Sequence, residues 1–141
     1  MPYLTVTRKK PHTFDVDVDG HVLVVEDRPA GRGHGFGPTP VELTVAALAS
    51  GVAAAVDGYL SHRSLRASGV RVSAHYRLSA AAPRRIGSID LTVTLPPDLP
   101  LDLRAEVQRA IGRCIVETAM PESPEVGVIL VAGEAASPAT R

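Results

Sequence analysis

Alternating apolar and polar residues near the N-terminus predict an antiparallel sheet. The alternation runs over residues 2–7, 13–18 and 21–26, and Asp19-Gly20 separates the last two segments. Asp-Gly suits a two-residue type I′ turn because both of its positions need positive φ, which Gly adopts freely and Asp tolerates. We therefore predict three antiparallel strands, with a tight hairpin between the second and the third.

A long helix is expected after a segment rich in glycine and proline. Residues 29–40 hold four glycines and three prolines, which predict a loop. At its end Thr39 can cap a helix, Pro40 fits the first helical position, and Glu42 completes the Thr-x-x-Glu pattern of a capping box. The helix should therefore begin at Pro40 and run to about His62.

The predicted helix is apolar and rich in small side chains. Alanine and glycine outnumber leucine and isoleucine in residues 41–60, and Glu42 and Asp57 lie inside this stretch, so transfer into lipid would be weakly favourable at best. Small residues around much of the circumference let other elements approach closely. We expect a central helix buried in protein, with Asp57 either at its wet end or paired with a cation.

Two further alternating segments, residues 70–78 and 86–95, predict two more strands. Pro96-Pro97 ends the second one. From about Leu101, apolar residues recur at helical spacing to near Thr118 and predict a second helix.

The remaining pattern indicates one domain. Residues 126–131 predict a last short strand, and residues 132–141, rich in Ala, Ser, Pro and Thr, are expected to form a mobile tail. The helices are grouped rather than alternating regularly with strands, which favours an α+β fold for a single domain over residues 1–131.

Charge and composition exclude several classes of function. Lys plus Arg and Asp plus Glu both total 15, aromatic residues make up 4% and Trp is absent, so a nucleic-acid partner is not expected. The first ten residues lack the apolar core of a signal peptide, which favours a cytoplasmic protein.

The five histidines show no paired ligand spacing, so neither a metal nor another cofactor is expected. The glycines of residues 31–37 lack the spacing of a phosphate-binding loop, and no Gly-x-Ser-x-Gly elbow is present for a hydrolase.

The number of cysteines limits the thiol chemistry that the chain can carry out, because Cys114 is its only cysteine. This excludes an intrachain disulfide and any mechanism that needs two thiols in one subunit. Cys114 lies on the apolar side of the predicted second helix, where a lone cysteine is more often an inert core residue than a reactive one.

One segment resembles the signature of the OsmC/Ohr family of osmotically inducible and organic-hydroperoxide-resistance proteins. This segment is residues 37–50, Gly-Pro-Thr-Pro-Val-Glu-Leu-Thr-Val-Ala-Ala-Leu-Ala-Ser. That signature is Gly-x-x-Pro-x-Glu-Leu followed by an Ala-rich helix, and the order of predicted elements agrees over nearly the whole chain. The resemblance implies an OsmC-like fold and an intertwined homodimer with two equivalent pockets between the subunits.

The family's peroxide-reducing members resemble one another in having two cysteines, and in this chain other residues stand at both positions. The first corresponds to Gly51 in the central helix, and the best match to the second is Thr118. A peroxidatic thiolate attacks the O–O bond and a resolving thiol then forms a disulfide, which neither glycine nor threonine can do. A displaced thiol at Cys114, reduced by an external partner, is the remaining route to such chemistry.

The resemblance also implies a pocket. Glu42 matches the motif glutamate that orients an arginine near the reactive thiol, although capping explains this residue without catalysis. Arg28 and Arg32 flank the glycine-rich loop, and the sequence does not choose between them. The candidate pocket residues are Arg28, Arg32, Glu42, Ser50, Gly51, Cys114 and Thr118.

Three hypotheses for function follow. The preferred one is a diverged family member that has no peroxidase centre and binds a small hydrophobic ligand. The second is a hydroperoxide reductase that uses Cys114 and an external thiol. The third is a structural or regulatory dimer with no ligand. No membrane partner is expected under any of them.

Overall fold

The computed structural model describes residues 3–28 and 35–113 and confirms the predicted α+β class. Three strands, β1 (Leu4–Lys10), β2 (Thr13–Val18) and β3 (His21–Glu26), form one antiparallel sheet in that order. The helix α1 (Pro40–His62) follows, and then β4 (Arg71–Leu78) and β5 (Ile86–Thr94) form a second antiparallel sheet. A single 3₁₀ turn, η2 (Leu101–Leu103), leads into the helix α2 (Arg104–Ile111).

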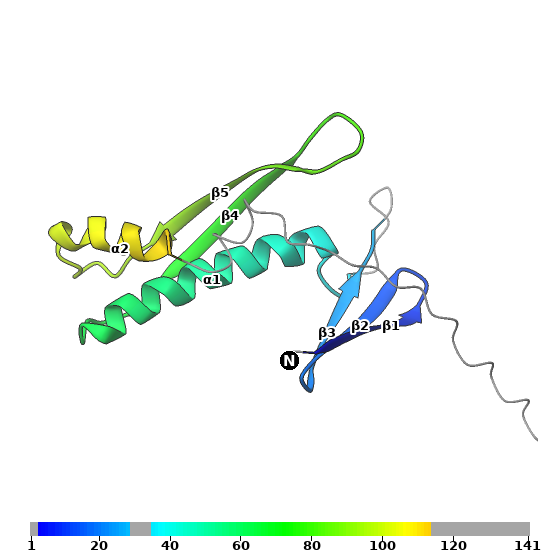
Figure 1. Cartoon of the computed structure of the whole chain (residues 1–141), viewed down its shortest axis with the longest axis horizontal. Helices are drawn as coiled ribbons and strands as arrows, with labels where there is room; N and C mark the ends of the chain where they lie inside the picture. The colour runs from blue at the N-terminus through cyan, green and yellow to red at the C-terminus, as the bar shows by residue number, and fades with distance from the viewer. Residues whose placement is uncertain (1–2, 29–34, 114–141) are drawn as a thin grey trace, which may run out of the picture.

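The two sheets lie at different places along α1. In Figure 1 the β4–β5 hairpin and α2 lie beside α1, whereas β1, β2 and β3 lie beyond its N-terminal end. The main core is therefore formed by the C-terminal half of α1, the second sheet and α2. Its buried members are Val56, Tyr59, Leu60 and Val107.

The first hairpin forms as predicted. β2 pairs with β3 in a register that sets Val18 opposite His21, and the two turn residues between them, Asp19 and Gly20, have φ of 50° and 85°. Asp17 also accepts a hydrogen bond from the Gly20 N–H at 2.8 Å. β1 ends later than expected, because Arg8 and Lys10 also pair with β2, across a register shift between them.

The second helix is shorter than predicted. A helix was expected from about Leu101 to near Thr118, but α2 begins at Arg104 and ends at Ile111. Gly112 is a poor helix former and occupies the C-cap, and the Arg113 N–H bonds to the Ala110 carbonyl in a tightened last turn. Thr118, Cys114, the strand predicted at 126–131 and the tail at 132–141 lie outside the described residues.

α1 is only partly buried within one chain. Its buried side chains are Val45, Leu48, Val52, Val56, Tyr59 and Leu60. Ala46, Ala47, Ala54 and Asp57 are exposed, so the prediction of a helix buried on several sides is not met by one chain alone, and Asp57 faces solvent. Among the described helices α1 is long and apolar enough to cross a membrane, but one such helix is weak evidence of a membrane span, because core helices of soluble proteins meet the same criteria.

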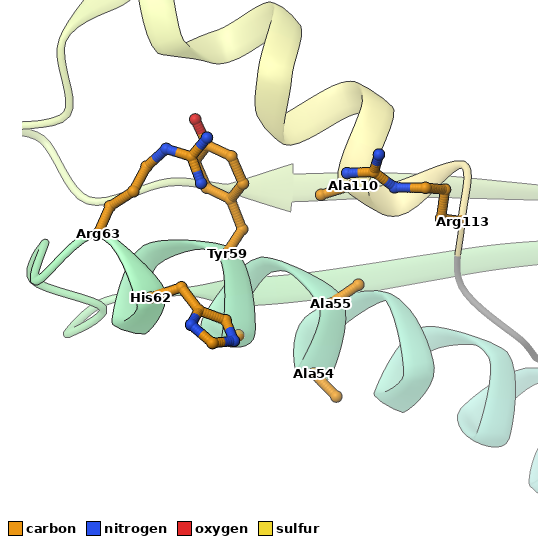
Figure 2. Close-up of a pocket in the computed structure, with 8 residues that line it drawn as sticks. Ala54, Ala55, Tyr59, His62, Arg63, Ala110 and Arg113 are labelled. Atoms are coloured by element: carbon orange, nitrogen blue, oxygen red, sulfur yellow. The ribbon is translucent and has the colours of Figure 1, made fainter.

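A polar cluster fastens α2 to α1. Tyr59 donates a hydrogen bond to Glu106 Oε2 at 2.5 Å, and Arg63 Nη2 donates to the same oxygen at 2.9 Å. The Arg63 guanidinium also lies over the Tyr59 ring, 4.1 Å from its centroid (Figure 2). We call these three residues the α1–α2 clamp.

The clamp shifts the pKa of two of its members in opposite directions. The hydrogen bond from Tyr59 is the main cause that lowers the pKa of Glu106 below 4.5, and the charges of Arg63 and Arg109 act in the same direction. Burial is the main cause that raises the pKa of Tyr59 above 10.0, and its bond to the Glu106 carboxylate raises it further.

These directions predict how stability depends on pH. Because the folded pKa of Glu106 lies below 4.5, its contribution is present above that pH and is lost as the pH falls through the lower folded value. Replacing Glu106 by Gln should therefore flatten the acid-side loss of the melting temperature, measured from neutral pH down to about pH 3. Asp102→Asn removes an exposed carboxylate of η2 and should leave the acid slope as in the parent protein. Equal slopes for the parent and Glu106→Gln proteins would contradict the assignment.

Candidate functional site

The N-terminus of α1 is closed by the capping box that the sequence predicts. The Thr39 hydroxyl accepts from the Glu42 N–H at 3.2 Å, and Glu42 Oε2 accepts from the Thr39 N–H at 2.8 Å. Thr39 has an extended backbone and Pro40 is the first helical residue, where its missing N–H costs nothing. The Glu42 carboxylate is thereby fixed at the positive end of the helix dipole.

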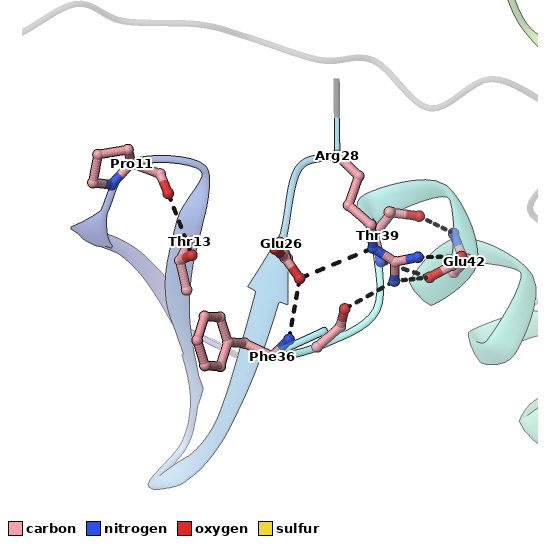
Figure 3. A network of polar contacts seen from close by, with 8 residues as sticks. Pro11, Thr13, Glu26, Arg28, Phe36, Thr39 and Glu42 are labelled. Atoms are coloured by element: carbon pink, nitrogen blue, oxygen red, sulfur yellow. Dashed lines mark hydrogen bonds and ion pairs between the residues drawn. The ribbon is translucent and has the colours of Figure 1, made fainter. Parts of the chain in front are cut away.

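The same carboxylate binds an arginine from the end of the first sheet. Arg28 follows β3, and its Nη2 and Nη1 donate to Glu42 Oε2 at 2.9 Å and to Oε1 at 3.4 Å (Figure 3). Nη2 also donates to the Gly37 carbonyl at 3.0 Å. Bidentate pairing of this kind fixes both the orientation and the position of the guanidinium group. Of the two candidate arginines, Arg28 is thus the partner of Glu42, and Arg32 lies outside the described residues.

Glu26 is a member of the site that sequence reasoning missed. It is the last residue of β3, is fully buried, and accepts a hydrogen bond from the Phe36 N–H at 3.1 Å. Its Oε2 also lies 4.0 Å from Arg28 Nε, so the guanidinium is held between two carboxylates. The sequence held one signal for this role, because Glu26 stands at the end of an apolar strand and two residues before Arg28.

Gly37 is needed where the glycine-rich loop crosses β3. An added Cβ there would lie 2.0 Å from the Val24 carbonyl oxygen, far closer than any side chain can approach. The Glu26 N–H bonds to the Pro38 carbonyl at 3.0 Å, so the loop is tied to the end of the strand. Glycine at this position therefore lets the loop deliver its carbonyl to Arg28.

An apolar groove opens beside this polar network. It has a volume of about 730 Å³ and lies between one face of the first sheet and the first turns of α1. Its lining residues are Leu4, Val6, Phe14, Val16, Val18, Leu23, Val25, Pro40, Leu43, Thr44 and Ala47. We call it the sheet–helix groove.

Among the described residues, Ser50 and Gly51 lie away from the Arg28–Glu42 pair along α1. Gly51 follows Glu42 by nine residues, which at 1.5 Å per residue places it about 13.5 Å along the helix and half a turn around it. Gly51 is half-buried, and Ser50 is exposed with its hydroxyl donating to the Ala46 carbonyl at 2.7 Å. Cys114 and Thr118 lie outside the described residues, so the complete predicted pocket stays a prediction.

The arrangement suits the binding of a polar group by Arg28 beside an apolar groove. Arg28 is about one-third exposed, and its Nε is buried without a hydrogen-bond partner. Within the described ranges, no three His, Cys, Asp or Glu side chains come together in a way that could hold a metal ion.

Two substitutions separate the capping role of Glu42 from its pairing role. Gln can still accept from the Thr39 N–H but carries no charge for Arg28, whereas Ala can do neither. Because both side chains of the pair are about one-third exposed, Glu42→Gln should lower the free energy of unfolding by at most about 1 kcal/mol. Glu42→Ala should cost about 1–2 kcal/mol because the cap is lost as well. Urea unfolding measures both, and equal losses would show that the cap contributes nothing.

Solved structures of similar shape belong to proteins described as OsmC-like or as stress-response proteins. An osmotic stress induced and detoxification response protein of Psychrobacter arcticus, described as putative, aligns with a TM-score of 0.76 and 16% identity, over 84% of this chain and 88% of its own. An OsmC-like protein of Mycoplasma pneumoniae aligns with a TM-score of 0.72 and 13% identity, over 87% and 89%. At such identities the likeness shows the fold alone.

Sequence comparison gives the family. No curated protein matched the sequence. The family model described as OsmC-like protein matches residues 31–128, which is more than half of the chain and includes the capped start of α1. The resemblance seen in residues 37–50 is thereby confirmed, and the chain belongs to the OsmC-like protein family.

Proposed function

We propose that this protein binds a small apolar ligand and does not carry out the two-thiol reduction of peroxides. The observation that carries the proposal is Gly51, half-buried in the middle of α1, in a chain that has one cysteine. The family resemblance expects the peroxidatic thiol at this position, and glycine supplies no nucleophile. A second thiol in the same subunit is excluded by the cysteine count.

The sheet–helix groove supports binding as the retained activity. Its volume of about 730 Å³ lies within the range of small-molecule pockets, and its walls are almost entirely apolar. The Arg28–Glu42 pair, which holds the start of α1, lies at the N-terminal end of the same helix. Stabilisation of the site by this pair needs no thiol, so binding can persist without the peroxidase centre.

A second copy of the chain is the proposed cover of the groove. Leu4 and Val6 are each 58% exposed and Leu23 is 44% exposed, although all three lie on the apolar face of the first sheet. A contiguous exposed apolar face of this size is typical of an interface. Two-fold pairing would cover both copies of the face and turn each open groove into an enclosed pocket between subunits.

Activity and binding assays test the proposed function. We expect no reduction of cumene hydroperoxide by dithiothreitol above the uncatalysed rate, in either the parent protein or Cys114→Ser. The neutral apolar dye Nile red should bind with increased fluorescence. Ala47→Phe fills the groove and should weaken dye binding about tenfold, whereas Ala46→Phe, an equally exposed neighbour that does not line the groove, should not.

Each alternative has its own outcome. Rapid peroxide reduction that Cys114→Ser abolishes would replace the proposal by a one-cysteine reductase. Absence of dye binding, or binding that Ala47→Phe leaves unchanged, would favour a dimer without a ligand in this groove.

The oligomeric state is tested separately. Light scattering should give twice the chain mass of 14.8 kDa. Val6→Asp places a charge on the apolar face of the first sheet and should shift the mass towards the monomer, whereas Thr5→Asp places the charge on the opposite face and should not. A parent protein of 14.8 kDa would contradict the proposed dimer.

A further inference from the structure

A second groove lies between α1 and α2, towards the C-terminal end of α1. It has a volume of about 360 Å³. Two arginines line it, and Figure 2 shows that their side chains enter from opposite ends, Arg63 from the end of α1 and Arg113 from the end of α2. We call it the α1–α2 groove.

Positive charge is in excess around this groove. Arg63, Arg109 and Arg113 line it or the adjoining hollow, and they face one carboxylate, that of Glu106. Glu106 is already engaged by Tyr59 and Arg63 in the α1–α2 clamp. In the described part of the chain, the guanidinium groups of Arg109 and Arg113 have neither an ion-pair nor a hydrogen-bond partner. Arg113 is thus available to an anion, and Arg109, whose charge acts on Glu106 without a direct ion pair, lies beside it.

The wall of the groove is apolar and has room for a chain of carbon atoms. Ala55, Gly58 and Ala110 line it with small groups. A Cβ added at Gly58 would meet no atom within 4 Å, so the space beside this residue is open. Glycine inside a helix is unfavourable relative to alanine, yet here it keeps the groove free.

We propose that the α1–α2 groove binds a small amphipathic carboxylate, such as a medium-chain fatty acid. The carboxylate pairs with Arg113, with Arg109 close by, and the alkyl chain lies along Ala55, Gly58 and Ala110. Guanidinium groups match carboxylates in plane and in donor spacing. Arg63 and Tyr59 already donate hydrogen bonds to the carboxylate of Glu106 beside the groove. This is an intramolecular example of the arginine–carboxylate pairing proposed for the ligand. The site is separate from the sheet–helix groove and does not depend on the function proposed for it.

Calorimetric titration of the full-length protein with octanoate tests the proposal. Arg113→Gln removes the main cation and should weaken octanoate binding about tenfold, as the loss of a charged hydrogen bond predicts. Gly58→Leu should weaken it at least as much by filling the groove, while the helix is retained because Leu is the better helix former. Arg104→Gln, an exposed arginine of α2 that does not line the groove, should bind octanoate like the parent protein.

Two further ligands test the contributions of the carboxylate charge and of the alkyl chain separately. Inorganic phosphate carries charge without a chain and should bind much more weakly than octanoate. Octanol carries the chain without the charge, so any octanol binding in the groove should be weakened by Gly58→Leu but not by Arg113→Gln. Ala47→Phe, which blocks the sheet–helix groove, should leave octanoate binding unchanged. The proposal is overturned if octanoate does not bind, if Arg113→Gln or Gly58→Leu binds it like the parent protein, or if phosphate binds as tightly.

Discussion

The carboxylate of Glu42 joins the two halves of this fold. One of its oxygens accepts from the Thr39 N–H and from Arg28 Nη2, so the cap of α1 and the end of β3 share a single atom. Arg28 is a long side chain that could adopt many positions, and the two-pronged pair reduces these to one. The direction in which the first sheet leaves α1 therefore depends on this carboxylate, and so does the shape of the sheet–helix groove.

The elements with local signals could be predicted from the sequence. Asp19-Gly20 specified a hairpin, and Thr39, Pro40 and Glu42 specified the first residue of α1, because turns and caps depend on neighbours within four positions. The end of α2 was predicted too late because apolar spacing was given more weight than Gly112.

The partners within the site could not be predicted in the same way. Arg28 and Arg32 both flank the glycine-rich loop, and no local pattern indicates that Arg28 meets Glu42, fourteen residues further along the chain. Glu26 was overlooked because a glutamate at the end of a strand is normally solvated. Its carboxylate accepts a hydrogen bond from the Phe36 N–H, ten residues away, and such non-local contacts leave no periodic signal.

The proposed loss of thiol chemistry is compatible with this scaffold, because the polar interactions that hold α1 to its described neighbours contain no sulfur. The Arg28–Glu42 pair, the capping box and the α1–α2 clamp are all made by oxygen and nitrogen atoms of residues other than Gly51. A substitution at the family's cysteine position therefore removes a reactive group without removing a support.

The separate placement of the two sheets has a consequence for motion. Within the described residues, the first sheet is tied to α1 mainly by β3 and residues 35–39, whereas the second sheet packs along that helix. We therefore expect the backbone amides of β1–β3 and those of β4–β5 to belong to different cooperative units, which open with different free energies. An isolated subunit would expose the first unit to hydrogen exchange while the second stayed closed.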